Sequence, residues 1–162
     1  MDNLTKAQRR RCMGNNRSKN TAIERRLAAA LRSDGRRFAL QARHLPGSPD
    51  FVFFEAQVAV FVDGDFWHGW RLPAWERKLS RFWREKLRRN RRRDVSAHRK
   101  LRRRGWKVVR IWEHQLDKNM TDCLERVGSA VDARLTDHPG SEQRSRRLRA
   151  QTAWAVGAVN GR

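Results

Sequence analysis

The stretch DFVFFEAQVAVFV, residues 50–62, contains two short runs that are rich in β-branched and aromatic residues. Runs of this length and composition favour β-strands. Only the three residues 55–57 separate the run 50–54 from the run 58–62, a spacing that suits a β-hairpin. We therefore predict that these two strands pair with each other.

Helices and further strands are predicted on both sides of this hairpin. Thr21 and Glu24 fit the S/T-x-x-E capping box that starts a helix. In chain order we predict a helix from Thr21 to about Ser33, strands at 38–41, 50–54, 58–62 and 106–112, a long helix from Glu76 or Lys78 to Arg104, and a last helix from Thr121 to Leu135. This order predicts an α/β fold, with a mixed central sheet of about four strands flanked by helices.

Positive charge dominates the chain and is concentrated in one segment. The 162 residues include 38 Lys and Arg against 17 Asp and Glu, a formal net charge of +21. Residues 76–105 hold 15 of these cations and 3 of the acids, a net of +12. Such a density of like charge favours a polyanion as partner, with nucleic acid first and an anionic membrane surface second. The predicted DNA contacts in this segment are Arg84, Lys86, Arg88, Arg89, Arg91, Arg92 and Arg93.

Several classes of protein are excluded by what the sequence lacks. No run of about 18 apolar residues is present, so no membrane-spanning helix is expected. The start Met1–Leu4 lacks the apolar stretch of a signal peptide. Two cysteines, Cys12 and Cys123, cannot form a disulfide framework. We therefore expect a cytoplasmic protein, associated with the nucleoid of a bacterial cell.

The scarce acidic residues fall where the two central strands end. Asp50 opens one strand directly after Pro49, and Asp63 closes the next, so a hairpin brings the two carboxylates close together. Magnesium prefers hard oxygen ligands, usually one or two carboxylates with waters and substrate phosphates. Such an ion can activate water and stabilise charge on a phosphodiester. An acidic point in a strongly basic chain therefore predicts metal-dependent phosphodiester cleavage.

His68 follows Asp63 by five residues and is a candidate general base or acid. A histidine titrates near neutral pH and can take a proton from water, although a loop histidine bonded to backbone fits this spacing as well. Asp65 is either a partner of His68 or a turn residue. Aromatic side chains nearby can stack on bases, wedge between them or pack in the core. The candidates are Phe66, Trp67 and Trp83.

Motifs spread along the chain carry a family resemblance. The central one is VFVDGDFWHG, residues 60–69, preceded by Pro49-Asp50. The others are Arg17–Thr21 with Glu24, Phe82–Lys86 with Asn90 and Asp94, Gly105–Val108, and Ile111–His114. Together they resemble the very-short-patch repair (Vsr-like) DNA mismatch endonucleases, over about residues 9–128. The resemblance implies a restriction-endonuclease-like core of the PD-(D/E)xK superfamily that nicks one DNA strand.

The resemblance also implies roles for individual residues. The aspartate at the position of Asp50 binds magnesium, together with the backbone carbonyl at the position of Val62. The histidine at the position of His68 is the general base, and a glutamate at the position of Glu24 lies at the site, where it competes with the capping role. The family wedges aromatics into DNA beside the mismatch, at positions that match Phe66, Trp67 and Trp83.

This chain departs from the family pattern at several positions. Asp63 stands in place of a histidine and could add a second metal ligand, so one or two Mg²⁺ ions are expected. Known members hold a structural zinc, whereas this chain lacks the usual zinc ligands, so we predict no structural zinc. A residual site formed by Asp65, His68 and His114 stays open.

The sequence therefore predicts a hydrolase of double-stranded DNA with a nuclease domain over residues 1–135, including a basic N-terminal arm, and a basic C-terminal tail over 136–162. The expected reaction is a nick beside a T·G mismatch in very short patch repair, with other mismatch-repair proteins as partners. One alternative is a nicking or restriction-type nuclease of a mobile element or defence system without mismatch specificity. The other is a non-catalytic basic nucleic-acid-binding protein.

Overall fold

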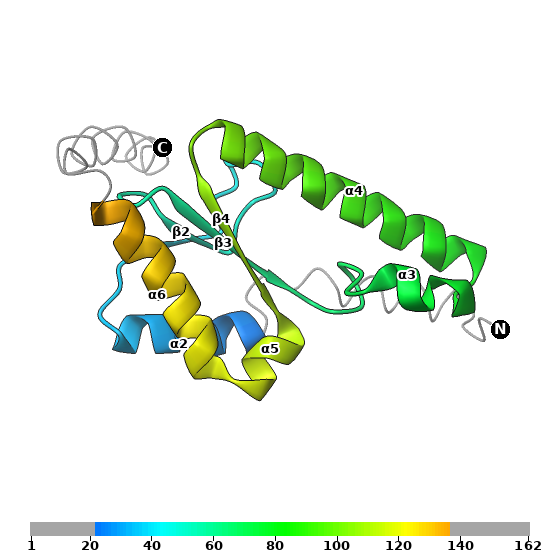
Figure 1. The fold of residues 1–162 in the computed structure, drawn as a ribbon, viewed down its shortest axis with the longest axis horizontal. Coiled ribbons are helices and arrows are strands. Elements are labelled where there is room, and N and C mark those ends of the chain that lie inside the picture. The colour runs from blue at the N-terminus through cyan, green and yellow to red at the C-terminus, as the bar shows by residue number, and fades with distance from the viewer. Residues whose placement is uncertain (1–21, 137–162) are drawn as a thin grey trace, which may run out of the picture.

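The computed structural model describes residues 22–136, which fold around a four-stranded sheet (Figure 1). Its strands are β1 (Ala39–Leu40), β2 (Phe51–Phe53), β3 (Val58–Asp63) and β4 (Lys107–Trp112), in the spatial order β1-β2-β3-β4. The first three strands are antiparallel, and β4 runs parallel to β3. The predicted hairpin and the mixed sheet of an α/β fold are thereby confirmed.

The two faces of the sheet pack against different helices because alternate residues of a strand point to opposite sides. One face carries a core that is shared with α2 (Ala22–Ser33) and α6 (Met120–Thr136). Its strand residues are Phe51, Phe53, Val58, Val60, Val109 and Ile111. The other face packs on α4 (Arg81–Arg103) through Val52, Ala59, Phe61 and Leu101.

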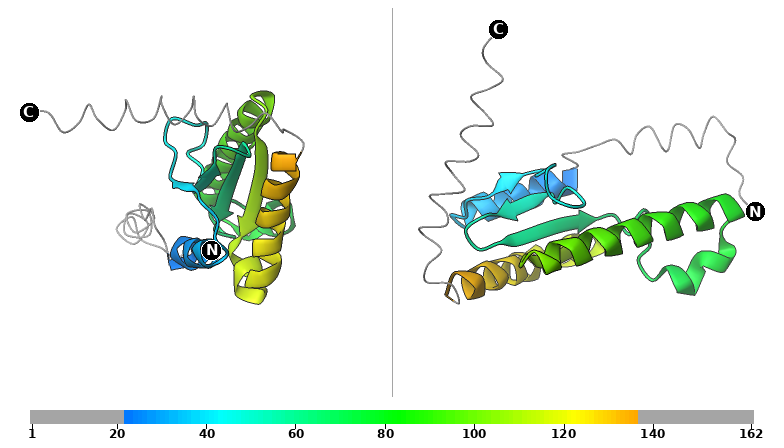
Figure 2. Two further views of the ribbon diagram at one scale, coloured as in Figure 1. Left: turned by 90° about the vertical axis from the view of Figure 1, so that its left-hand side faces the viewer. Right: turned by 90° about the horizontal axis from the view of Figure 1, so that it is seen from above.

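The long helix begins later than predicted. The chain from Leu72 to Lys78 forms a short helix α3 (Leu72–Trp75) and a 3₁₀ turn η1 (Glu76–Lys78), and Leu79 is then extended. Ser80 is the N-cap of α4, a position that serine favours. At about 1.5 Å per residue, the 23 residues of α4 span roughly 34 Å. The N-terminal half of α4 therefore reaches past the sheet with α3 beside it, as Figure 1 and the right-hand view of Figure 2 show.

A short helix α5 (Glu113–Lys118) precedes α6 and was not predicted. It has six residues, of which only Leu116 is buried, so it leaves no helical periodicity to detect. Thr21 lies outside the described residues, as do the arm before it and residues 137–162. The boundary near residue 135 between domain and tail stays a prediction.

The helices between residues 22 and 136 are all too short or too polar to cross a membrane.

His98 is a buried titratable group in the core between α4 and the sheet. Its side chain contacts the ring of Phe61, with 4.5 Å between ring centres, and the residue is only 4% exposed. Burial lowers the pKa of His98, and the nearby charge of Arg110 lowers it further, against the opposing charges of Asp63 and Asp94. The folded protein therefore binds a proton at His98 less readily than the unfolded chain does.

This shift predicts a pH-dependent loss of stability. As pH falls below the ordinary histidine pKa of about 6.5, the unfolded state takes up the proton first, so the fold loses stability. Between pH 7.5 and 5.5 we expect the free energy of unfolding of the wild type to fall on the order of 1 kcal/mol more than that of His98→Leu. Urea unfolding of both proteins at each pH measures the difference, and parallel pH profiles would contradict the prediction.

Candidate active site

The β2–β3 hairpin brings Asp50 to the end of β3, as the sequence predicted. The backbone N–H of Asp50 donates to the carbonyl of Val60 at 3.0 Å. Its carboxylate then reaches forward along β3, where Oδ2 accepts a hydrogen bond of 2.7 Å from the backbone N–H of Val62. Asp63, the last residue of β3, is adjacent. The Asp50 carboxylate is therefore fixed by main-chain geometry.

Asp50 is an unusual carboxylate because its environment opposes ionisation. Burial raises its pKa from 3.8 to about 7, and the negative charges of Glu24 and Asp63 add to the rise. The bond from Val62 and the charge of His68 act in the opposite direction but do not offset burial. A half-buried carboxylate of this kind is a candidate ligand for a cation, which would supply the missing positive charge.

His68 is held in a tight turn that follows β3. Its backbone N–H donates to the carbonyl of Gly64 at 3.1 Å, and Gly69 takes the left-handed conformation at φ 67°. The Nδ1 atom of His68 lies 2.7 Å from Oδ2 of Asp94 and 3.0 Å from Oδ1 of Asp63. Because ionised carboxylates only accept hydrogen bonds, the proton of the neutral imidazole sits on Nδ1, and Nε2 of that form is left as the acceptor.

The two carboxylates also set the charge of His68. Burial alone would lower the pKa of His68, but the hydrogen bond to Asp94 and the charge of Asp63 outweigh it, so the pKa lies above the usual value. For Asp94, from the middle of α4, burial acts to raise the pKa, but the bond to His68 and the positive charges of His68, Arg93 and Arg110 together lower it. The sequence pointed to Asp94 only as part of a motif, and its contact with His68 spans 26 residues.

Both oxygens of Asp63 are engaged within the protein. Oδ1 faces His68, and Oδ2 accepts from Nε of Arg110. Asp63 is 3% exposed. The prediction that Asp63 is a second metal ligand stays a prediction, and the geometry gives Asp63 a contact with the general-base candidate instead.

The residual metal site of Asp65, His68 and His114 does not assemble as a triad. Asp65 Oδ1 pairs with His114 Nδ1 at 2.7 Å, and Trp70 packs on the His114 ring, whereas His68 is paired with Asp63 and Asp94. Within residues 22–136, no three His, Cys, Asp or Glu side chains are grouped so that they could hold a metal ion by themselves. That Asp50 and the Val62 carbonyl hold magnesium stays a prediction, which asks for a sparse set of hard oxygens. Such a set fits magnesium, which usually keeps several waters and adds substrate phosphates.

Glu24 lies in the first turn of α2 and is half-buried. It is close enough for its charge to raise the pKa of Asp50, which places it beside the site. The capping partner, Thr21, lies outside the described residues, so the competition between cap and site residue is not decided by geometry.

The aromatic residues next to the site form one cluster with an exposed edge. Phe66 contacts Trp67, Trp75 and Trp83, with ring centres 5.1 to 5.9 Å apart. Trp83 is 5% exposed, whereas Phe66 and Phe82 are 39% and 41% exposed. Phe82 was not among the predicted contacts. Its exposure in the first turn of the basic helix α4 is visible only in the structure.

The predicted basic contacts on α4 fall into two groups. Four have partners inside the protein: Arg84 donates to the Leu79 carbonyl, Arg88 makes two hydrogen bonds to Glu76, Lys86 lies over the rings of Trp67 and Trp83, and the exposed Arg93 lies 3.4 Å from Oδ1 of Asp94. The others, Arg89, Arg91 and Arg92, are exposed. This second group is the part of α4 that can approach a phosphate backbone.

These elements define a nuclease of the restriction-endonuclease-like class, in which strand ends carry the reactive groups. A family model for "DNA mismatch endonuclease Vsr" matches residues 1–73. The chain is 45% identical over 134 residues to the type II nicking enzyme V.NmeDIP of Neisseria meningitidis serogroup C, covering 81% of this chain and 90% of that one. It is 36% identical over 148 residues to the DNA mismatch endonuclease Vsr of Escherichia coli (strain K12), covering 83% and 91%. The chain belongs to the Vsr family of DNA endonucleases.

Proposed function

We propose that this protein is a magnesium-dependent endonuclease that nicks one strand of duplex DNA beside a T·G mismatch, as a step of very short patch repair. One observation carries the proposal. A carboxylate with a raised pKa, Asp50, is anchored beside a histidine, His68, that two carboxylates hold with Nε2 as acceptor.

Magnesium would be held by the Asp50 carboxylate and the Val62 carbonyl. When bound, it lowers the pKa of a coordinated water and stabilises negative charge on the scissile phosphate. His68 Nε2 takes the proton from the attacking water. Asp94 fixes the ring and its tautomer through Nδ1. Glu24 adds negative charge beside Asp50 and in this way favours a bound cation.

DNA binding is assigned to the projecting half of α4 and the aromatic cluster. The exposed arginines of α4 neutralise backbone phosphates. Phe66 is exposed and rests on Trp67, so it can enter a base step that a mismatch has weakened, with buried Trp83 as support.

The phosphate contacts predict a change in salt dependence. Each phosphate contact contributes about 0.9 to the slope of log affinity against log salt concentration. We expect Arg91→Gln/Arg92→Gln to make this negative slope shallower by roughly 1 to 2. Arg37→Gln/Arg43→Gln removes the same charge from exposed loops around β1 and should keep the slope close to the wild-type value. Fluorescence anisotropy of a labelled duplex at several salt concentrations measures the slopes. Equal slopes for the two double variants would contradict the assignment of α4.

A matched pair of duplexes tests the proposed function. Duplexes that differ only in T·G or C·G at one position are incubated with the full-length protein and MgCl₂, and strand scission is followed on a denaturing gel. Nicking of the T·G duplex alone supports the proposal. Equal nicking of both supports the second candidate, a nicking nuclease without mismatch specificity; the names of several relatives mention nicking and no mismatch. Binding without cutting in any divalent metal rejects both candidates.

Structural zinc and partner proteins belong to the same proposal. The Asp65–His114 pair, packed on Trp70, links the turn after β3 to the start of α5 without a metal. We propose that no zinc is needed, which metal analysis of the purified protein can test. We also propose that the protein acts at the bacterial nucleoid with other mismatch-repair proteins.

A further inference from the structure

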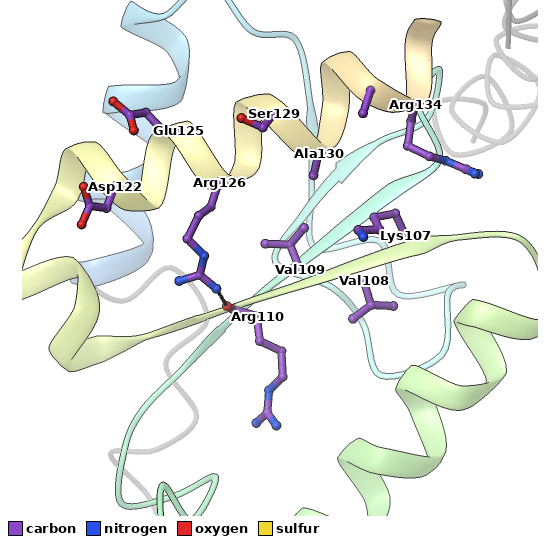
Figure 3. Close-up of a pocket in the computed structure, with 11 residues that line it drawn as sticks. Lys107, Val108, Val109, Arg110, Asp122, Glu125, Arg126, Ser129, Ala130 and Arg134 are labelled. Carbon is purple, nitrogen blue, oxygen red and sulfur yellow. Dashed lines mark hydrogen bonds between the residues drawn. The ribbon is translucent and has the colours of Figure 1, made fainter. Parts of the chain in front are cut away.

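A charged residue of β4, absent from the predicted site, faces the same side of the sheet as Asp63. Phe61 and Asp63 of β3 are two residues apart and share a face, and Arg110 is the register partner of Phe61. Phe61 contacts His98 of α4, so this face is the one covered by α4. In Figure 3, Arg126 of α6 reaches the backbone oxygen of Arg110, while the guanidinium of Arg110 points away from α6. Arg110 therefore lies between the sheet and α4.

The contacts of Arg110 connect it to the general-base candidate through one carboxylate. Its Nε donates to Oδ2 of Asp63 at 2.5 Å, and the other Asp63 oxygen lies 3.0 Å from Nδ1 of His68. The guanidinium carbon lies 4.4 Å from the ring centre of Trp112, which limits its movement. Asp63 is almost fully buried, and the guanidinium of Arg110 places a positive charge beside its carboxylate.

The pair is poorly built as a device for stability alone. The Nη2 atom of Arg110 is buried and has no hydrogen-bond partner among residues 22–136. A buried donor left unsatisfied costs free energy, and replacing a buried ion pair by apolar residues is often neutral or stabilising. The Asp63–Arg110 pair is therefore better explained by the contact that Asp63 makes with His68 than by a gain in stability.

We propose that Arg110 is a positioning residue for nicking: it holds the Asp63 carboxylate against Nδ1 of His68 and thereby directs Nε2 toward the attacking water. Arg110 acts through Asp63 and does not contact DNA. The inference rests on the proposed function, in which His68 is the general base.

Steady-state nicking by the full-length protein tests this role, on whichever duplex the wild type cuts. For Arg110→Met we expect kcat to fall roughly 10- to 100-fold, part of the ~10²–10⁴ that a positioned general base contributes. KM should stay within about 3-fold of the wild-type value. The salt slope of DNA binding should match that of the wild type, although a positive charge is removed. Arg110→Lys keeps the cation and should recover part of kcat. An increased KM with unchanged kcat would make Arg110 a phosphate contact and overturn the inference.

A double variant separates positioning from folding. Asp63→Asn/Arg110→Met removes the buried charge together with its partner, so it should fold at least as well as Arg110→Met alone. We expect its kcat to stay as low as that of Arg110→Met, and the ¹⁵N–¹H imidazole signals of His68 to show loss of the fixed Nδ1–H form in both. Wild-type kcat in the double variant would show that the pair only stabilises the fold.

His68→Ala distinguishes a failure of the role of Arg110 from a failure of the proposed function. If His68→Ala is inactive while Arg110→Met nicks at the wild-type rate, the inference about Arg110 fails and the proposed function stands. If His68→Ala nicks at the wild-type rate, the proposed function itself fails.

Discussion

Replacing Asp50 by Asn is expected to abolish nicking while leaving DNA binding intact. The amide can still accept the hydrogen bond from the Val62 N–H, so the local backbone geometry should be kept. It lacks the negative charge that holds magnesium, and a metal ion contributes several kcal/mol of transition-state stabilisation. We expect at least a ~10²-fold loss of nicking rate, with DNA affinity equal to or above that of the wild type. Gel assays on supercoiled plasmid and anisotropy measure the two quantities.

The same substitution should stabilise the metal-free protein at alkaline pH. The pKa of Asp50 is about 7 in the fold against 3.8 for an ordinary aspartate. A raised pKa means that the folded state binds the proton more tightly, so stability is greatest below pH 4 and is lost as pH rises through 7. At pH 8 Asp50→Asn should therefore be more stable by ~4 kcal/mol, and the gain should vanish near pH 4. Added MgCl₂ should raise the stability of the wild type and leave that of Asp50→Asn unchanged.

Asp122→Asn is the matched control for Asp50→Asn. Asp122 is an exposed aspartate in the first turn of α6. The control should nick and unfold like the wild type. Residual nicking by Asp50→Asn at more than about a tenth of the wild-type rate would remove Asp50 from the metal site.

Loss of the His68 imidazole is the second large effect. His68→Ala should lower the nicking rate ~10²–10⁴-fold at neutral pH, the range that a positioned general base contributes. The nicking rate of Asp94→Asn should lie between those of the wild type and His68→Ala. The amide no longer favours the Nδ1–H form of His68, whereas Asp63 still does. Single-turnover nicking with saturating protein measures the chemical step, and DNA affinity should be unchanged in both variants.

The control for His68 is the same change at an exposed histidine. His44 stacks on Phe54 near β1, remote from the strand ends that carry the site. His44→Ala should nick normally. If Asp94→Asn also nicked normally, Nδ1 would not need the contact from α4, and the positioning role of Asp94 would be wrong.

Local pattern was enough to predict most of the fold. The hairpin, β4 and α6 were predicted because alternation and apolar composition are properties of neighbouring residues. The later start of α4 and the separate α5 were not predicted, because one depends on a break at Leu79 and the other has a single buried residue. Asp50 and Asp63 were identified as candidates from their places at the ends of predicted strands.

The sequence alone therefore determined which groups and elements are present: carboxylates at strand ends, a histidine in the next turn, and a helix with dense positive charge. The tertiary structure decided which of these groups meet. Asp94 and Arg110 reach His68 and Asp63 only because α4 covers one face of the sheet and β4 pairs in parallel with β3. Such contacts follow from helix rotation and strand register, which packing of the whole core sets and no local spacing encodes.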